Sequence, residues 1–215
     1  MNTRFKTVII LLLFATLSGV YAQKIGIELG YLNPLRTGTA ESSTNFKGIR
    51  VGGTVAFDLK YNFSLLTGAL YQVVYADKIQ NYTAGDSVRY STWGHSIDVP
   101  LRIQYTYQIA NYLKVFGFAG PNINIGLAQP QKITASFAPE SVLGTLTGIE
   151  SGNYDLYKRA LIHRMNFQLG AGAGIQWKNY QLKGGYDFGI NSINKVDSNR
   201  ILRYSGWYVS LVYEF

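Results

Sequence analysis

Two histidines, His95 and His163, are the residues on which hydrolytic or acyl-transfer chemistry could be built. Such chemistry needs a nucleophilic hydroxyl within hydrogen-bond reach of the imidazole, and usually an acid that orients the ring. His95 is followed by Ser96 and, two residues later, by Asp98. In an extended strand, however, adjacent side chains point to opposite faces. His95 and Ser96 would therefore not meet on one face.

The residue that would share a strand face with each histidine lies two positions further along the chain. Those positions hold Ile97 and Met165, neither of which is a nucleophile. The chain has no cysteine, which removes a thiol nucleophile, disulfides and thiolate metal sites. The acidic residues of the polar segments also lack the spacing of a calcium loop. We therefore expect no catalytic residue, no metal site and no cofactor, and interpret both histidines as interfacial or packed in loops.

Residues 170–174 alternate glycine and alanine, which superficially resembles a nucleotide-binding loop. The spacing is not that of the dinucleotide fingerprint, and no helix is expected to follow. Small residues on a barrel strand more simply make room for large lumen side chains, or allow the strand to curve. We interpret this run as structural.

The elements that must position these residues are β-strands. Segments 96–107, 161–177 and 206–215 alternate apolar and polar residues with a period of two, which predicts strands with one apolar face. Five further strands are predicted at 24–32, 48–61, 64–76, 113–127 and 181–192. In the third and fifth strands along the chain both faces are apolar, so the sequence leaves their outward faces open.

The connections between these strands alternate between short and long. The short ones are 61–64, 108–112 and 178–180, and the longer, polar ones are 33–47, 77–95, 128–160 and 193–203. Transmembrane barrels have tight periplasmic turns and longer outer loops, so both termini would lie at the periplasmic end. The longest connection also carries apolar residues, and it could dock a partner, fold over the barrel mouth or extend strands beyond the membrane.

Aromatic residues gather at the ends of the predicted strands, where a membrane interface would use their amphipathic rings. They are Tyr61, Phe63, Tyr105, Tyr107, Tyr112, Trp177, Tyr180 and Phe215. The sequence therefore predicts an all-β fold, an eight-stranded antiparallel up-and-down transmembrane β-barrel. The alternative is a soluble, lipocalin-like barrel in the periplasm, in which the apolar face of each strand points inward and the polar face points to solvent.

Charged residues make up 15% of the chain, below the roughly one quarter of a soluble domain. Nine of them fall opposite an apolar strand face and form a predicted lumen network: Arg50, Asp58, Lys60, Asp98, Arg102, Arg164, Lys183, Asp187 and Glu214. An eight-stranded barrel is wide enough only for its own side chains. Because buried charges must be paired to be tolerated, we expect a network that plugs the lumen and not an open pore.

Residues 1–22 are predicted to be a cleaved signal peptide, and 23–215 the barrel domain. Arg4 and Lys6 precede an apolar run, 8–17, that is shorter than the roughly 20 residues of a spanning helix, and small residues lead to Ala22. An uncleaved anchor is the alternative. Gln23 in place of a cysteine argues against a lipid anchor. Cleavage leaves 18 basic and 12 acidic residues without a basic run, so anionic lipid is expected as a partner and nucleic acid is not.

Three motifs resemble a known family: 99–102 (Val-Pro-Leu-Arg), 116–121 (Phe-Gly-Phe-Ala-Gly-Pro) and the aromatic end 213–215. They are similar to the PorT-like outer-membrane β-barrel proteins of Bacteroidota. The resemblance implies an eight-stranded barrel in the outer membrane and, for most members, no defined activity. It also implies a C-terminal signal for the barrel assembly machinery, carried here by Trp207, Val209, Leu211, Tyr213 and Phe215.

The function expected from these observations is a structural or interaction role in the bacterial outer membrane, in which outer loops contact a ligand or an envelope protein partner. Outer-membrane lipid and the assembly machinery are the other expected partners. Two alternatives stay open besides the lipocalin-like binder. One is a lipid-modifying enzyme, resembling outer-membrane deacylases and palmitoyltransferases, that would use His95 or His163. The other is a narrow channel.

Overall fold

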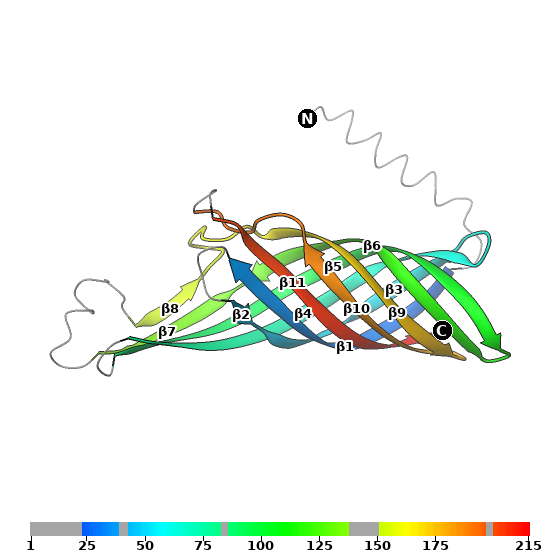
Figure 1. The fold of residues 1–215 in the computed structure, drawn as a ribbon, viewed down its shortest axis with the longest axis horizontal. Coiled ribbons are helices and arrows are strands. Elements are labelled where there is room, and N and C mark those ends of the chain that lie inside the picture. The colour runs from blue at the N-terminus through cyan, green and yellow to red at the C-terminus, as the bar shows by residue number, and fades with distance from the viewer. Residues whose placement is uncertain (1–22, 39–42, 83–85, 138–150, 197–199) are drawn as a thin grey trace, which may run out of the picture.

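The computed structural model describes residues 23–38, 43–82, 86–137, 151–196 and 200–215 (Figure 1). In chain order, the strands are β1 (Gln23–Gly38), β2 (Thr44–Asn45), β3 (Lys47–Asp58), β4 (Phe63–Asn81), β5 (Ser87–Ala110), β6 (Leu113–Ala128), β7 (Pro130–Ser136), β8 (Gly152–Asp155), β9 (Met165–Trp177), β10 (Tyr180–Gly189) and β11 (Leu202–Glu214). Within these ranges, no helix has the length and apolar character needed to cross a membrane.

Eight of the strands form a closed antiparallel ring. Each of β1, β3, β4, β5, β6, β9, β10 and β11 pairs with the next, and β11 returns to pair with β1. The closing pair runs in register from Gly26 opposite Glu214 to Gly38 opposite Leu202. The predicted eight-stranded, up-and-down barrel is therefore confirmed, and Figure 1 shows its strands tilted relative to the long axis.

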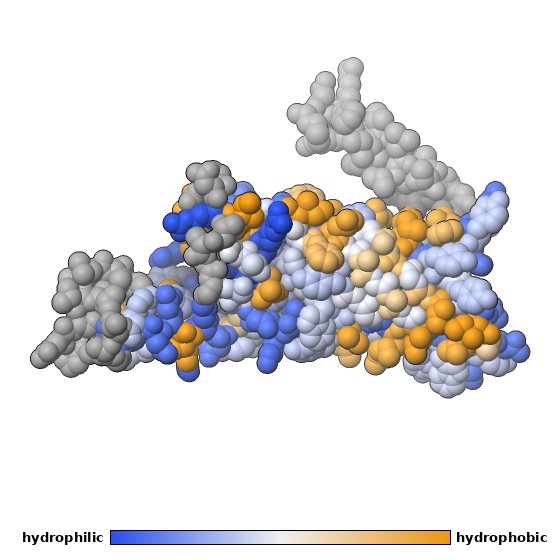
Figure 2. Space-filling model, viewed as in Figure 1, coloured by the Kyte–Doolittle hydropathy of each residue, from blue (hydrophilic) through white to orange (hydrophobic). Residues whose placement is uncertain are grey.

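The alternation seen in the sequence becomes an outside and an inside. On β11, Val209 and Leu211 are exposed, whereas Ser210 and Val212 are buried in the lumen. Hydrophobic residues are spread over the side of the barrel in Figure 2, and hydrophilic residues gather toward the end that carries β7 and β8. An apolar outside around a polar inside is the reverse of a lipocalin-like soluble barrel.

The two strands with apolar residues on both faces are now oriented. β4 points Leu70 and Val74 into the lumen, and β6 points Phe116 and Phe118 there. Their other faces are directed outward with the rest of the apolar surface.

Glycines on β9 explain how the two phenylalanines fit. A Cβ atom at Gly172 would lie 2.3 Å from Cζ of Phe118, and one at Gly174 would lie 2.4 Å from Cζ of Phe116. The rings therefore occupy space that only glycine leaves open. This confirms the prediction that the small residues of 170–174 make room for large lumen side chains.

The three short turns lie at one end of the barrel, together with both ends of the described chain (Figure 1). The turn after β3 is tight because Tyr61 and Asn62 adopt left-handed backbone angles, with φ of 59° and 64°. The main-chain N–H of Phe215 donates to the carbonyl of Ile25 at 2.9 Å, which ties the C-terminus to β1. The predicted alternation of short and long connections is confirmed.

The long connections contain more strand than the sequence predicted. Residues 77–95 were expected to form a loop, but β4 and β5 remain paired up to Asn81 and Ser87. Part of 128–160 forms β7 and β8, which add to β5 beyond the barrel. Of the three uses left open for that connection, its described part extends strands. Polar residues do not exclude a strand here, because both faces of a sheet outside the membrane can meet water.

Candidate functional site

The middle of the lumen is filled by a charge cluster centred on Glu28. Glu28 is completely buried, accepts a hydrogen bond from Arg50, and lies 2.7 Å from Nζ of Lys183 through its other oxygen. Nε of Arg50 donates to Oγ of Ser210 at 3.0 Å, and its guanidinium lies 3.6 Å from the ring centroid of Tyr208. Strands β1, β3, β10 and β11 are thus joined across the lumen.

A second set of buried charges lies beside this cluster. The guanidinium of Arg102, which is only 2% exposed, pairs with Asp187 and also donates to a main-chain carbonyl. Asp98 accepts hydrogen bonds from the amides of Gln72 and Asn124, the latter at 2.6 Å. We call the six charged residues of both sets the plug: Glu28, Arg50, Asp98, Arg102, Lys183 and Asp187.

Little space remains around the plug. The two cavities that its residues line measure about 20 and 10 Å³. A single water molecule needs roughly 10–15 Å³ of this kind of volume. Each of these two cavities therefore has room for no more than one or two water molecules.

Five of the nine charges predicted to line the lumen belong to the plug, and two more lie at the inner mouth. Asp58 is half-buried and pairs with Lys24 at 2.7 Å. Glu214 accepts hydrogen bonds from Gln176 at 2.8 Å and from Gln181 at 2.7 Å. These residues line a cavity of about 240 Å³ that lies at the end of the short turns.

The prediction for Lys60 is wrong, because this residue does not point into the lumen, whereas Arg164 lines a cavity of about 30 Å³ at the outer end of the lumen beside the buried residues Asn124 and Asn166. β3 ends at Asp58, so Lys60 falls in the tight turn and is exposed. Arg164 precedes the first residue of β9 and donates to the carbonyls of Gly126 and Leu127, at 3.1 and 2.6 Å. Counting every second residue along the strands selects both residues, but Lys60 follows the last residue of β3 and Arg164 precedes the first residue of β9.

The central residue of the plug, Glu28, was not among the predicted lumen charges. Its strand carries the necessary signal, because Ile25, Ile27 and Leu29 all point outward. Alternation places Glu28 on the opposite face. The sequence could therefore have identified it.

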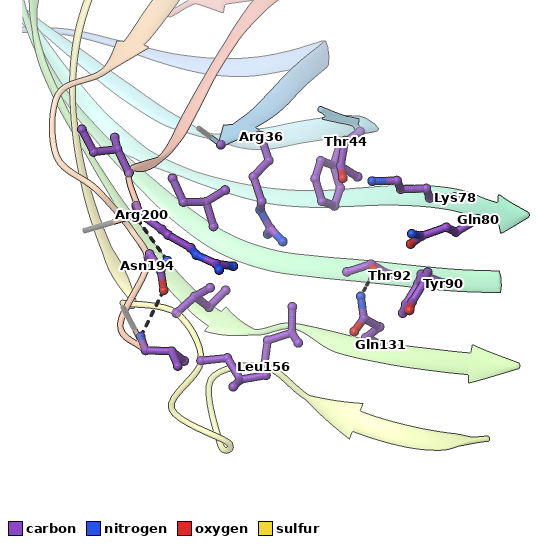
Figure 3. Close-up of a pocket in the computed structure, with 17 residues that line it drawn as sticks. Arg36, Thr44, Lys78, Gln80, Tyr90, Thr92, Gln131, Leu156, Asn194 and Arg200 are labelled. Carbon is purple, nitrogen blue, oxygen red and sulfur yellow. Dashed lines mark hydrogen bonds between the residues drawn. The ribbon is translucent and has the colours of Figure 1, made fainter. Parts of the chain in front are cut away.

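At the outer end, the lumen widens into a cavity of about 590 Å³, which we call the vestibule (Figure 3). Phe46, which is fully buried, lies at its base and packs edge-on against Tyr204, with ring centroids 6.0 Å apart. The guanidinium of Arg36 lies 5.0 Å from the Phe46 ring centroid. On the β5 side, Nε2 of Gln131 donates to Oγ1 of Thr92 at 3.0 Å.

Residues 21–195, most of the chain, match the family described as the outer membrane protein beta-barrel domain. The chain belongs to this family. Its location is accordingly the bacterial outer membrane, and the exposed apolar side of the ring is the surface that meets lipid.

Several solved structures are similar to this outer-membrane barrel. A major outer membrane protein of Thermus thermophilus is 16% identical, with a TM-score of 0.45, and the match covers 91% of this chain and 100% of that one. Ail, the attachment invasion locus protein of Yersinia pestis, is 12% identical with the same coverages and a TM-score of 0.40. Neisserial surface protein A is 10% identical, again with these coverages, and has a TM-score of 0.42. No curated protein matches the sequence.

The two histidines of the outer-membrane barrel line the same cavity of about 30 Å³, together with Ser96, but they have different hydrogen-bond partners. Nδ1 of His95 lies 2.8 Å from the hydroxyl of Tyr71 on the outer side of the wall, so its partner is a phenol and not a serine. His163 is exposed, and its main-chain N–H donates to the carbonyl of Ile193 at 2.7 Å. Within the described ranges, no three histidine, aspartate or glutamate side chains converge as metal ligands.

Tyr157 closes a small space between the plug and the vestibule. Its hydroxyl lies where a side chain at position 126 would begin, since a Cβ atom on Gly126 would come within 2.0 Å of it. Burial raises the pKa of Tyr157, although the charges of Arg36 and Arg164 act in the opposite direction. The hydroxyl therefore stays protonated at neutral pH.

The predicted assembly residues lie on the lipid-facing side of the last strand. They are Trp207, Val209, Leu211, Tyr213 and Phe215, and all are exposed. The geometry thus places them on one continuous face of β11 and its C-terminal extension.

Proposed function

We propose that this outer-membrane barrel is a closed interaction protein, which does not conduct through its lumen and acts by binding at its outer end. The observation that carries the proposal is the contrast along the lumen. At mid-height the cavities measure about 10 and 20 Å³, whereas the vestibule measures about 590 Å³. A structure that is solid in the middle and hollow at its outer end suits binding better than transport.

The charge composition of the plug supports a closed lumen. Three of its side chains are basic, Arg50, Arg102 and Lys183, and three are acidic, Glu28, Asp98 and Asp187. Opening a path would separate buried charges from their partners. Breaking a buried pair in this way costs about 3–5 kcal/mol. The plug is therefore expected to stay in place without an input of that size.

Single-channel recording in planar bilayers tests the closed lumen. The mature protein is expected to give no conductance steps. The positive control is a variant in which three plug residues are replaced together, Glu28→Ala, Arg50→Ala and Lys183→Ala, which removes opposite charges and bulk at once. Steps in the variant alone would support the proposal, and steps of comparable size in the unaltered protein would overturn it.

We also propose that the protein is not an enzyme. The hydroxyl beside His95 belongs to Tyr71, a much weaker nucleophile for acyl transfer than an activated serine. Incubation with phospholipids and lipopolysaccharide, followed by mass spectrometry of the lipids, is expected to show no change. Lipid cleavage or acyl transfer that disappears in a His95→Ala or His163→Ala variant would contradict this proposal.

The sequence supports more specific proposals about the family group, the export and the assembly of the barrel. The three resembling motifs support membership of the PorT-like group of Bacteroidota, and residues 1–22 support export by a cleaved signal peptide. The lipid-facing residues of β11 support recognition by the barrel assembly machinery, and the outer strands β7 and β8 offer a surface to an envelope protein partner. Removal of Phe215 is expected to lower the amount of barrel in the outer membrane, whereas Phe63→Leu, at the same end, should not.

A further inference from the structure

We infer that the vestibule binds an anionic amphiphile, a molecule that carries a phosphate, sulfate or carboxylate group on an apolar body. This inference rests on the proposed function, because it names the ligand class for the outer end of a closed barrel. It depends on the charges, walls and size of the vestibule.

Three cations from separate parts of the chain meet in the vestibule. Arg36 comes from β1, Lys78 from β4, and Arg200 from the segment that leads into β11. Figure 3 shows the three side chains pointing into the same space. The described residues that line this cavity include no aspartate or glutamate. Cationic side chains that converge on a concave site attract anions, and arginine is well suited to phosphate and carboxylate.

The opposite wall of the vestibule is apolar. Leu156 lies across the space from Arg36 and Lys78 in Figure 3. The other apolar lining residues come from the segments that precede β9 and β11 and from the start of β11: Leu161, Ile162, Val196, Ile201 and Leu202. Such a wall cannot bind a bare anion, but it can bury the apolar part of a ligand whose charged group reaches the cations.

The dimensions and the remaining polar groups suit a small molecule. The volume of about 590 Å³ falls within the roughly 300–1,000 Å³ typical of small-molecule sites. Gln80, Tyr90 and Thr92 line it as hydrogen-bonding groups. Because the plug blocks the lumen below, the ligand must enter from outside the cell or from the outer leaflet.

Calorimetric titration of the mature protein in phosphatidylcholine nanodiscs tests the ligand class. The probe is 1-naphthyl phosphate. Two compounds are compared with it: 1-naphthol, which has the apolar ring without the charge, and inorganic phosphate, which has the charge without the ring. Naphthyl phosphate is expected to bind at least about tenfold more tightly than either of these compounds, a difference that calorimetry resolves readily. If 1-naphthol binds as tightly as naphthyl phosphate, the site is merely apolar. If inorganic phosphate binds as tightly as naphthyl phosphate, the site is merely cationic. Either result would overturn the inference.

Replacing part of the phosphatidylcholine by phosphatidylglycerol separates the two sources of the anion. If membrane lipid is the natural ligand, phosphatidylglycerol should occupy the vestibule and reduce naphthyl phosphate binding. If the natural ligand is soluble, naphthyl phosphate should bind equally well to discs with and without phosphatidylglycerol. The comparison is made at high salt, where repulsion between the anionic lipid and the anionic probe is screened.

Matched variants locate the binding. Arg36→Gln and Arg200→Gln are each expected to weaken naphthyl phosphate binding by about tenfold. Lys132→Gln removes the same charge from the exposed side of β7, outside the vestibule, and should leave binding unchanged. Ile201→Asn should also weaken it, whereas Ile79→Asn, an exposed position on β4 that does not line the vestibule, should not. A heat-dependent mobility shift on gels confirms that each variant is folded.

The outcomes for this inference and for the proposed function are distinguishable. If the barrel does not conduct and naphthyl phosphate does not bind, or binds equally to Arg36→Gln, Arg200→Gln and the unaltered protein, the inference is overturned and the closed barrel stands. If the unaltered barrel conducts, the proposed function fails whatever the titration shows.

Discussion

The plug and the vestibule both place charged side chains inside the barrel, but they arrange them in opposite ways. In the plug, basic and acidic groups are equal in number, and Glu28 and Asp187 pair directly with basic side chains. In the vestibule, Arg36, Lys78 and Arg200 converge around open space with no carboxylate in the described lining. Charge balance therefore separates a region that holds the fold together from a region that can hold a ligand.

The same comparison predicts where substitutions should be costly. Plug residues are deeply buried and cross-link strands, so removing one leaves a charge without a partner in a region of low dielectric. Arg200 of the vestibule is exposed, so removing its charge should change binding more than stability. The four predictions that follow test this difference in order of decreasing effect on the free energy of unfolding.

Glu28→Gln should have the largest effect, because it leaves Arg50 and Lys183 buried together without their shared carboxylate. We expect a loss of about 3–5 kcal/mol in the free energy of unfolding. Urea titration of the barrel in phospholipid vesicles, followed by tryptophan fluorescence, measures it. The matched control is Asp58→Asn, whose half-exposed pair with Lys24 should be worth less than about 1 kcal/mol. Equal losses in the two variants would show that burial of the pair is unimportant.

Gly170→Ala should disturb the plug without removing a charge. The new methyl group would lie 1.7 Å from Oδ1 of Asp187 and 2.7 Å from Nη1 of Arg102, so their ion pair must shift. We expect a loss of about 1–3 kcal/mol by the same urea titration. Gly53→Ala is the control, since nothing lies within 4 Å of its added carbon. An unchanged Gly170→Ala variant would mean that the pair does not need its present geometry.

Replacing the pair Arg102 and Asp187 together, as Arg102→Met with Asp187→Leu, should be much milder than either change alone. Apolar residues of similar volume can substitute for a buried ion pair at little cost, here about 1 kcal/mol or less. A double-mutant cycle measured by urea titration gives the coupling between the two sites. Additive losses from the single variants would contradict the direct pairing.

Arg200→Gln should have the smallest effect on stability, within about 0.5 kcal/mol, because its side chain is exposed at the outer end. The same variant should nevertheless weaken naphthyl phosphate binding. Urea titration and calorimetry on one preparation therefore separate the two regions. A large loss of stability would place Arg200 with the plug and not with the vestibule.

Much of the barrel could be predicted from the sequence because a strand has only two faces. Alternation on 96–107, 161–177 and 206–215 was sufficient to assign what faces lipid and what faces the lumen. It failed where both faces are apolar, because the orientation of Phe116 and Phe118 depends on glycines that meet them across the strand pair. The contact between these phenylalanines and the glycines of β9 cannot be predicted from the sequence of either strand alone.

The vestibule could not be predicted in the same way. Arg36, Lys78 and Arg200 lie far apart in the chain and on segments that the sequence assigned to polar connections. Only the continuation of β1 and β4 beyond the membrane, together with the path of the segment before β11, brings them into one cavity. The alternation within a strand describes one segment at a time, so it cannot predict that residues from three distant segments line one cavity. Lys60 shows the related error of extending an alternation past the end of a strand.

The pairing of β1 with β11 has a consequence for how the molecule is made. β1 has β3 as one neighbour, but its other neighbour, β11, is the last strand of the ring in chain order, so the ring cannot close before β11 is in place. Until then, one edge of β1 and one edge of the strand at the other side of the open sheet are unpaired, which is a hazard for aggregation. β11 covers both of these edges when it pairs with β1 and β10, so this one strand removes the exposure from the whole sheet.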